Sequence, residues 1–98
     1  MQIAIPLYDG FTALDAVGPY EVLVRLLGSQ VVFCGAEGRP HRTDTKALAI
    51  HADATFAEVT APDIIVVPGG PGSCGRLRRI GRLWEAVPLR WPAVALTG

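Results

Sequence analysis

The 98-residue sequence has only two cysteines, one methionine and no net charge, because nine basic residues balance nine acidic ones. It has no run approaching the roughly 18 consecutive apolar residues that a membrane-spanning helix needs. The first twenty residues lack the basic segment and apolar stretch of a secretory signal peptide. These absences argue against a transmembrane protein and a disulfide-stabilised secreted domain. They predict a cytoplasmic chain in which Cys34 and Cys74 are free thiols.

The neutral total conceals two segments of opposite charge. Residues 1–73 carry eight acidic and four basic residues, a net charge of −4, whereas residues 74–98 carry five arginines against Glu85 alone, a net charge of +4. The second segment also holds both tryptophans. A basic segment can bind nucleic acid or a membrane surface, but arginines without lysine or an interleaved aromatic platform are a weak form of that pattern. We therefore expect neither a nucleic-acid partner nor membrane contact.

The distribution of apolar residues predicts an alternation of strands and helices. Short apolar runs bounded by turn residues predict strands at residues 3–7, 31–34, 64–67 and 93–98, and one or two short strands within 41–52. Helical spacing predicts a helix divided at Gly18-Pro19 and ended by Gly28, a single helical turn after Asp53, and a helix at residues 74–87. This order predicts one α/β domain over residues 1–98, with a doubly wound, mostly parallel sheet.

Polar and glycine-rich segments follow three of the predicted strands, at residues 8–15, 68–73 and 97–98. In an open parallel sheet, ligands bind in the crevice beyond the carboxyl ends of the strands. A binding or catalytic site is therefore expected where these segments meet. The alternative is that they are ordinary connections whose glycines serve only the backbone geometry.

Other motifs in the sequence are weak. Residues 70–75 fit the G-x-G-x-x-G pattern of dinucleotide-binding loops, but Pro71 removes a backbone donor and no acidic residue follows at the required distance. The two histidines and their neighbouring aspartates are spaced too widely for a compact metal site, so we expect no metal and no cofactor. Cys34 is expected to be a small buried hydrophobic residue. Cys74, near a predicted helix N-terminus and Arg76, is a candidate reactive thiol.

Two motifs resemble a known family. They are L-D-x-x-G-P-x-E-V-L at residues 14–23 and V-P-G-G-x-G at residues 67–72. Together they resemble the ThiJ/PfpI superfamily, which is class I glutamine amidotransferase-like, and within it the isonitrile hydratase-like branch. The resemblance covers residues 2–73, the N-terminal portion of the family domain. It implies a flavodoxin-like, usually dimeric fold with a cysteine nucleophile in a V-C-T-G sequence at a sharp turn from strand to helix.

The resemblance implies roles for individual residues in the matched segment. Asp15 is implied to be the acidic partner of the nucleophile, and a carboxyl there can exchange a proton with a bound isonitrile or its hydrated product. The alternative role for Asp15 is helix capping, in a capping box with Thr12, and it could perform both roles at the same time. Gly70, together with the neighbouring Gly69, is implied to present a backbone N–H to the substrate or to an oxyanion.

The sequence departs from the family pattern after Ser73. Residues 95–98 stand where V-C-T-G is expected, which puts Leu96 in the nucleophile position and Thr97 in that of the adjoining threonine, the second implied catalytic residue. Leucine has no nucleophilic atom, so the sequence leaves open whether the chain is an enzyme. Residues 74–92 also match the family poorly, and the sheet is expected to be incomplete relative to the family.

Three functions are compatible with these patterns. The first is hydration of an isonitrile to an N-substituted formamide, for which this form of the chain is expected to be inactive because it has no cysteine in the nucleophile position. The second is a non-catalytic small-molecule-sensing or interaction module, related to the amidase-like domain of AraC-type transcriptional regulators. The third is a truncated or frameshifted family member without independent function. A homodimer or other self-association is expected from the resemblance.

Overall fold

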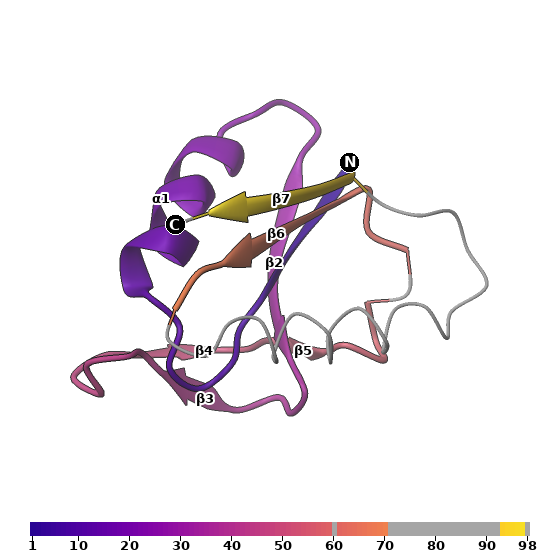
Figure 1. Cartoon of the computed structure of the whole chain (residues 1–98). Helices are drawn as coiled ribbons and strands as arrows, with labels where there is room; N and C mark the ends of the chain where they lie inside the picture. Colours follow the sequence, from indigo (N-terminus) through magenta and orange to yellow (C-terminus); the bar gives the residue numbers. More distant parts are fainter. Residues whose placement is uncertain (60, 71–92, 98) are drawn as a thin grey trace.

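The described part of the chain is built around one parallel sheet. A computed structural model describes residues 1–59, 61–70 and 93–97. The strands are arranged in the spatial order β5-β2-β1-β6-β7, and every neighbouring pair runs parallel (Figure 1). Their bounds are β1 (Gln2–Pro6), β2 (Gln30–Gly35), β5 (Ala54–Thr55), β6 (Ile64–Pro68) and β7 (Ala93–Thr97). The predicted α/β class with a mostly parallel sheet is confirmed.

The neighbouring strands β1 and β6 contribute buried residues to the hydrophobic core. Ile3 and Ile5 of β1 are fully buried. Val66 and Val67 of β6 expose only a few per cent of their surface. A strand covered on both faces of a parallel sheet needs a continuous apolar run rather than an alternating one. That requirement explains why the short apolar runs in the sequence predict both strands.

One helix, α1 (Ala13–Leu23), connects β1 to β2. The predicted break at Gly18-Pro19 is wrong, because Pro19 lies inside a continuous helix. Gly18 accounts for this, since it lacks the Cβ that normally clashes with the ring of a following proline in helical geometry. The predicted helix end at Gly28 is also wrong. Gly28 instead adopts a positive φ of 76° in the turn before β2.

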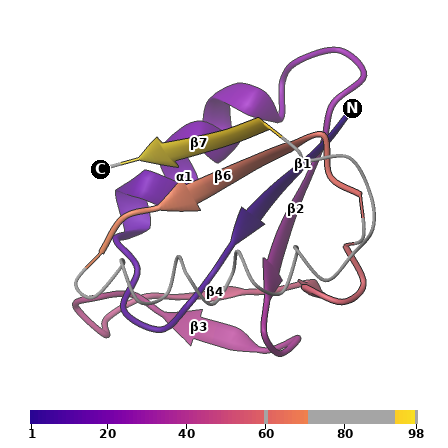
Figure 2. The same ribbon diagram turned by 45° about the vertical axis from the view of Figure 1, so that its right-hand side comes forward.

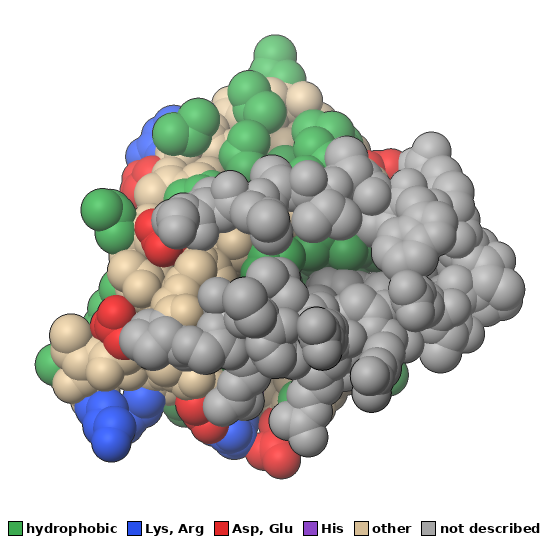
Figure 3. Space-filling view, viewed as in Figure 1, with side chains coloured by type: hydrophobic (Ala, Val, Ile, Leu, Met, Phe, Trp, Pro, Cys, Tyr) green, Lys and Arg blue, Asp and Glu red, His purple; other side chains and the backbone are tan. Residues whose placement is uncertain are grey.

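The two sides of α1 have different surroundings. Its inner side packs toward the sheet through the buried Ala16 and through Tyr20, whose ring lies 5.4 Å from that of Phe33 on β2. Its outer side carries Leu14 and Val22, which are 75% and 67% exposed. Figure 3 shows hydrophobic side chains on the surface in this region. None of the described helical segments has the length and apolar character needed to cross a membrane.

A two-stranded antiparallel hairpin lies beside the sheet. It consists of β3 (Pro40–Arg42) and β4 (Ala49–His51), which confirms the short strands predicted within residues 41–52. The hairpin is attached to the loop after β1, because the Gly10 N–H donates to Arg42 O and the Asp44 N–H donates to Phe11 O, both at 2.9 Å. Figure 2 shows the hairpin below the sheet, away from α1.

The segment after β4 does not form the predicted helical turn. β5 begins directly after Asp53, and a hydrogen-bonded turn follows it. The Thr55 N–H and hydroxyl both donate to Glu58 Oε1 at 3.0 Å, and these donors hold the pKa of Glu58 below its ordinary value. Thr-x-x-Glu is the sequence of a capping box, in which the first and fourth residues exchange two hydrogen bonds at the start of a helix. Here the same motif closes a single turn. The predicted helix at residues 74–87 lies outside the described residues.

Candidate functional site

The strand order places a topological switch point between β1 and β6. The chain passes from β1 to β2 and β5 on one side, and then adds β6 and β7 on the other side. At such a reversal, the ligands of open parallel sheets bind beyond the carboxyl ends of the two neighbouring strands. The loops concerned are residues 7–12 and 69–70. The molecule is thus an α/β protein with a candidate site at the topological switch point of a parallel sheet.

Two hydrogen bonds join the loops that follow β1 and β6. The buried Tyr8 hydroxyl donates to Pro68 O at 2.7 Å, and the Thr12 N–H donates to Gly69 O at 2.8 Å. Both acceptors lie at the carboxyl end of β6, about 60 residues away along the chain. These bonds fix the two loops relative to each other before any ligand arrives, which lowers the ordering cost of binding.

Gly70 is a point of very close approach between the two loops. A Cβ at this position would lie 2.6 Å from Gly10 O and 3.0 Å from both Phe11 Cα and Tyr8 Oη. The first two atoms belong to the backbone, which cannot move aside as a flexible side chain can. Only glycine therefore fits here without a shift of the loop after β1. The packing holds the Gly70 peptide, the implied N–H donor, against that loop.

Asp15 lies in the first turn of α1, directly beyond the hydrogen bond that links Thr12 to Gly69. Its carboxylate is at the helix N-terminus, where the helix dipole favours negative charge. The predicted capping box is wrong: Thr12 is the N-cap residue, but its side chain makes no capping hydrogen bond. The Thr12 hydroxyl instead donates to Asp44 Oδ2 at 3.2 Å, because the hairpin docks beside the helix start.

The carboxyl end of β7 reaches the same edge of the sheet. The register pairs Val67 with Leu96 and Pro68 with Thr97. Thr97 therefore stands opposite the residue that precedes Gly69. Leu96 lies one position earlier in the strand, at the position that the resemblance assigns to the nucleophile.

Four of the five predicted site residues lie around this edge. Gly69, Gly70 and Thr97 follow or end neighbouring strands, and Asp15 is on the helix that begins beside them. Cys74, the fifth, lies outside the described residues. Among the described residues, no group of three or more His, Cys, Asp or Glu side chains is arranged to hold a metal ion.

Cys34 is unsuited to nucleophilic chemistry. It lies on β2 with no exposed surface, and burial raises the pKa of its thiol to about 12. The thiolate is the reactive form of cysteine, so a thiol that stays protonated at neutral pH is inert. Cys34 is the small buried hydrophobic residue that the sequence predicts.

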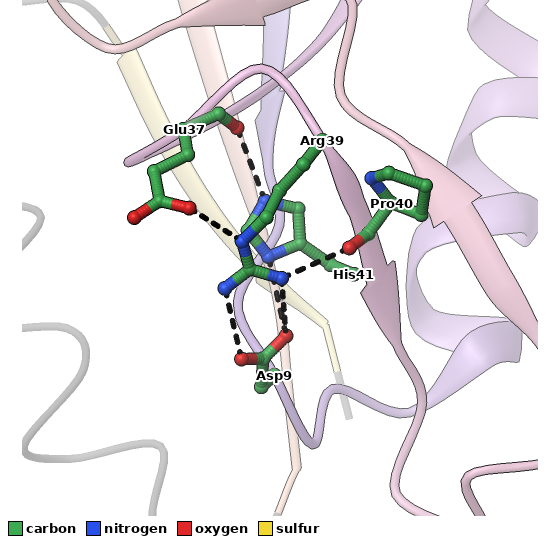
Figure 4. A network of polar contacts seen from close by, with 5 residues as sticks. All are labelled: Asp9, Glu37, Arg39, Pro40 and His41. Atoms are coloured by element: carbon green, nitrogen blue, oxygen red, sulfur yellow. Dashed lines mark hydrogen bonds and ion pairs between the residues drawn. The ribbon is translucent and has the colours of Figure 1, made fainter.

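A cluster of charged side chains beside the loop after β1 was not predicted from the sequence (Figure 4). Arg39 joins two acids, with Nη2 3.1 Å from Asp9 Oδ2 and Nε 2.6 Å from Glu37 Oε2. The buried His41 places Nδ1 3.3 Å from Asp9 Oδ1 and Nε2 3.3 Å from Glu37 O. Gly35 leaves space for the imidazole, because a Cβ there would lie 2.5 Å from Nε2. The cluster ties the loop after β1 to the turn before β3.

We expect Asp9 to contribute to stability at neutral pH and not in acid. The hydrogen bond from Arg39 holds the pKa of Asp9 below its ordinary value, although partial desolvation opposes this. A depressed folded-state pKa gives stability above the unfolded value of about 3.9, and this stability is lost as the pH falls through the folded value. Because Asp9 is half exposed, its replacement by asparagine should cost at most about 1 kcal/mol at pH 7.

Urea unfolding of the wild type and of Asp9→Asn at a series of pH values checks this expectation. The two unfolding free energies should differ at pH 7 and converge in acid, at a pH below the unfolded value of about 3.9. A difference that stays constant down to that pH would show that the carboxylate charge is not the cause.

Comparison with known proteins agrees with this architecture. The chain belongs to the DJ-1/PfpI family, whose sequence profile matches residues 1–88. Its structure is similar to that of a ThiJ/PfpI family protein from Pseudomonas syringae, with a TM-score of 0.83 and 25% identity over 97% of this chain and 40% of that chain. No curated protein matches the sequence. The family-level resemblance expected from the two motifs is therefore confirmed.

Two more distant structures share the fold. Drosophila melanogaster DJ-1beta has a TM-score of 0.79 and 22% identity over 97% of this chain and 53% of that chain. An AraC family transcriptional regulator from Pseudomonas putida has a TM-score of 0.70 and 21% identity over 97% of this chain and 54% of that chain. The chain thus spans about half the length of these structures or less, and its sheet corresponds to part of theirs.

Proposed function

We propose that this chain is a small-molecule-binding module of the DJ-1/PfpI family that holds its ligand at the carboxyl ends of β1, β6 and β7 without chemical turnover. The observation that carries this proposal is the fixed edge at the switch point. There, hydrogen bonds lock the loops after β1 and β6 together, and Gly70 fits against Gly10 with no room for a side chain. Loops that are fixed in this way before a ligand arrives support binding, because less ordering is needed.

The chemistry at this edge suits a small neutral ligand with a polar end. The Gly70 N–H is a donor suited to a carbonyl or formamide oxygen, and the Asp15 carboxylate is an acceptor for an N–H. By the resemblance to isonitrile hydratases, the ligand class is an isonitrile, its formamide, or a related small amide or carbonyl compound.

The residue in the nucleophile position supports the absence of turnover. The residue there is Leu96, which has no atom able to attack a substrate. Cys34 cannot substitute for it, because it is buried on β2 and its thiol has a pKa of about 12. The fold shared with an AraC family regulator supports a sensing role for the edge of the sheet at the switch point. In that role the module would act through a partner that carries the response.

The direct test is to titrate the full chain with cyclohexyl isocyanide and with N-cyclohexylformamide, following binding by calorimetry and product by chromatography. We expect saturable binding and no formamide above the buffer rate. Asp15→Asn should weaken the binding of N-cyclohexylformamide about tenfold. The formamide N–H would lose its charged acceptor, and a hydrogen bond to a charged group contributes roughly 1.5 kcal/mol. Glu21→Gln is the matched control: it removes one carboxylate from the exposed side of the same helix, where Glu21 pairs with Arg25.

Two results would overturn this proposal. Formamide production above the buffer rate would identify the chain as an isonitrile hydratase, the alternative that the Asp15 and Gly70 motifs favour. If neither compound binds, the proposed ligand class is wrong.

We also propose that the chain self-associates through the outer side of α1. Leu14 and Val22 are eight residues apart on one helix, with Gly18 between them, so they share a face. Both are exposed, and an exposed apolar face of this kind is typical of an interaction surface. Sedimentation velocity should show a dimer for the wild type and a shift toward monomer for Leu14→Gln/Val22→Gln. A wild type that remains monomeric at every concentration would contradict this expectation.

A further inference from the structure

A separate cavity lies between the loop after β1 and the β3–β4 hairpin. Its volume is about 430 Å³, within the usual range for small-molecule sites. Six of its seven lining residues carry a charged or polar side chain, and neither Asp15 nor any described residue of β6 or β7 contributes to it. It shares only Gly10 with the loop contacts that form the candidate site.

Two cations that have no carboxylate partner among the described residues line this cavity. In the described part of the chain, Arg25 pairs with Glu21, and Arg39 pairs with Asp9 and Glu37. The other two basic residues there, Arg42 and Lys46, form no ion pair with any described residue, and both line the cavity. Figure 3 shows Lys and Arg side chains gathered at the lower left, over the hairpin. The cavity therefore offers two positive charges to a ligand.

The hairpin turn holds these two cations close together. Arg42 Nη1 donates to Lys46 O at 3.0 Å, so the guanidinium is anchored to the backbone of the other cation. Lys46 adopts a φ of 64°, a left-handed conformation that costs roughly 1–2 kcal/mol for an ordinary residue. The Lys46 N–H, which donates to Thr43 O at 3.0 Å, helps to maintain it. The remaining guanidinium N–H groups retain the fork geometry that binds a carboxylate through two oxygens.

One carboxylate in the cavity complements the cations. Asp9 is engaged through both oxygens by Arg39. Asp44 accepts one hydrogen bond from Thr12, through Oδ2, and its Oδ1 makes no hydrogen bond or ion pair with another described residue. Asp44 thus offers an acceptor on a cavity that also holds two cations. A pure anion would be repelled by these acids, whereas a ligand carrying both charges matches both signs.

We propose that this cavity binds a small zwitterionic amino acid, with its carboxylate on Arg42 and Lys46 and its ammonium group on Asp44. The site is distinct from the one at the switch point and takes a different class of ligand. A ligand here would also contact Gly10, whose carbonyl packs against Gly70, so the two sites share one peptide.

The test is a calorimetric titration of the full chain with L-serine, with lactate and ethanolamine as single-charge comparisons. L-serine should bind at least tenfold more tightly than either. Arg42→Gln and Lys46→Gln should each weaken serine binding at least tenfold, and Arg42→Lys, which keeps the charge without the fork, should give an intermediate loss. Asp44→Asn should weaken the binding of serine and not of lactate. The Arg25→Gln variant, which loses a basic residue that lies just after α1 and outside the cavity, should bind serine as the wild type does.

Three outcomes would overturn the proposal: no serine binding by the wild type, unchanged serine binding in Arg42→Gln, or equal affinity for lactate and serine. Thermal unfolding of each variant establishes that it is folded. If Arg42→Gln does not fold, the charge-preserving Arg42→Lys variant still tests whether the guanidinium of Arg42 binds serine. No isonitrile or formamide enters this experiment. A failure here therefore leaves the proposed function standing, and a failure of the isonitrile titration leaves this site standing.

Discussion

Replacing Gly70 with alanine is expected to lower the free energy of unfolding by about 3 kcal/mol, the upper part of the range for overpacking a tight site. The added methyl group would meet Gly10 O at 2.6 Å and Phe11 Cα at 3.0 Å. Both are backbone atoms, so the loop after β1 must move or the end of β6 must withdraw. Either movement changes the candidate site, and ligand binding there should be lost along with the stability. Urea unfolding and the formamide titration measure the two effects.

Gly38→Ala is the matched control for this change. Gly38 lies in the turn between β2 and β3, and a Cβ there would meet nothing closer than Ala52 O at 3.8 Å, an ordinary contact. Its effect on stability should stay within about 0.5 kcal/mol. If Gly70→Ala matched this control in stability and ligand binding, the close approach of the two loops would not be a structural requirement.

Replacing Phe11 with alanine is the second change with a large expected effect, a loss of about 3–5 kcal/mol. The Phe11 side chain is fully buried and meets the Tyr8 ring edge to face, with 6.3 Å between the centroids. Its backbone also closes the loop after β1 and joins it to the hairpin, since the Phe11 N–H donates to Tyr8 O and Phe11 O accepts from the Asp44 N–H. A cavity at this position would loosen the sheet, the hairpin and the site together.

Denaturant unfolding followed by fluorescence and by circular dichroism measures this loss. Leu27→Ala is its control, because Leu27 is fully exposed and its truncation should change stability by no more than about 0.5 kcal/mol. Equal effects of the two substitutions would mean that the loop after β1 is not part of the core.

The strands were predictable because their signal is local. The apolar run at residues 64–67 has no polar residue to expose, and it must therefore lie inside a parallel sheet. The helix was harder, because two rules compete at Gly18-Pro19. Proline predicts a break, while glycine before it removes the clash that causes one. The turn at Thr55 and Glu58 follows a Thr-x-x-Glu motif in the sequence, whereas the prediction placed a helical turn after Asp53.

The candidate site was predictable only in part. The motif containing Asp15 and the motif containing Gly70 could be found by their resemblance to a family, and the topology explains why their elements meet. The charged cluster of Asp9, Arg39 and His41 could not be found in this way. Asp9 lies about 30 residues before the other two in the sequence, and no spacing rule connects them. The same applies to the contact between Gly70 and Gly10, which depends on how two loops approach in space.

The measurement that tests the central claim most directly is an amide-resolved NMR titration of the full chain with N-cyclohexylformamide. If the switch point is the ligand site, the largest shift changes will fall on Gly10, Asp15, Gly69 and Gly70, and the formamide will be recovered unchanged. Shift changes confined to the hairpin turn around Lys46, or no shift changes at all, would contradict the claim that the loops after β1 and β6 form the binding site.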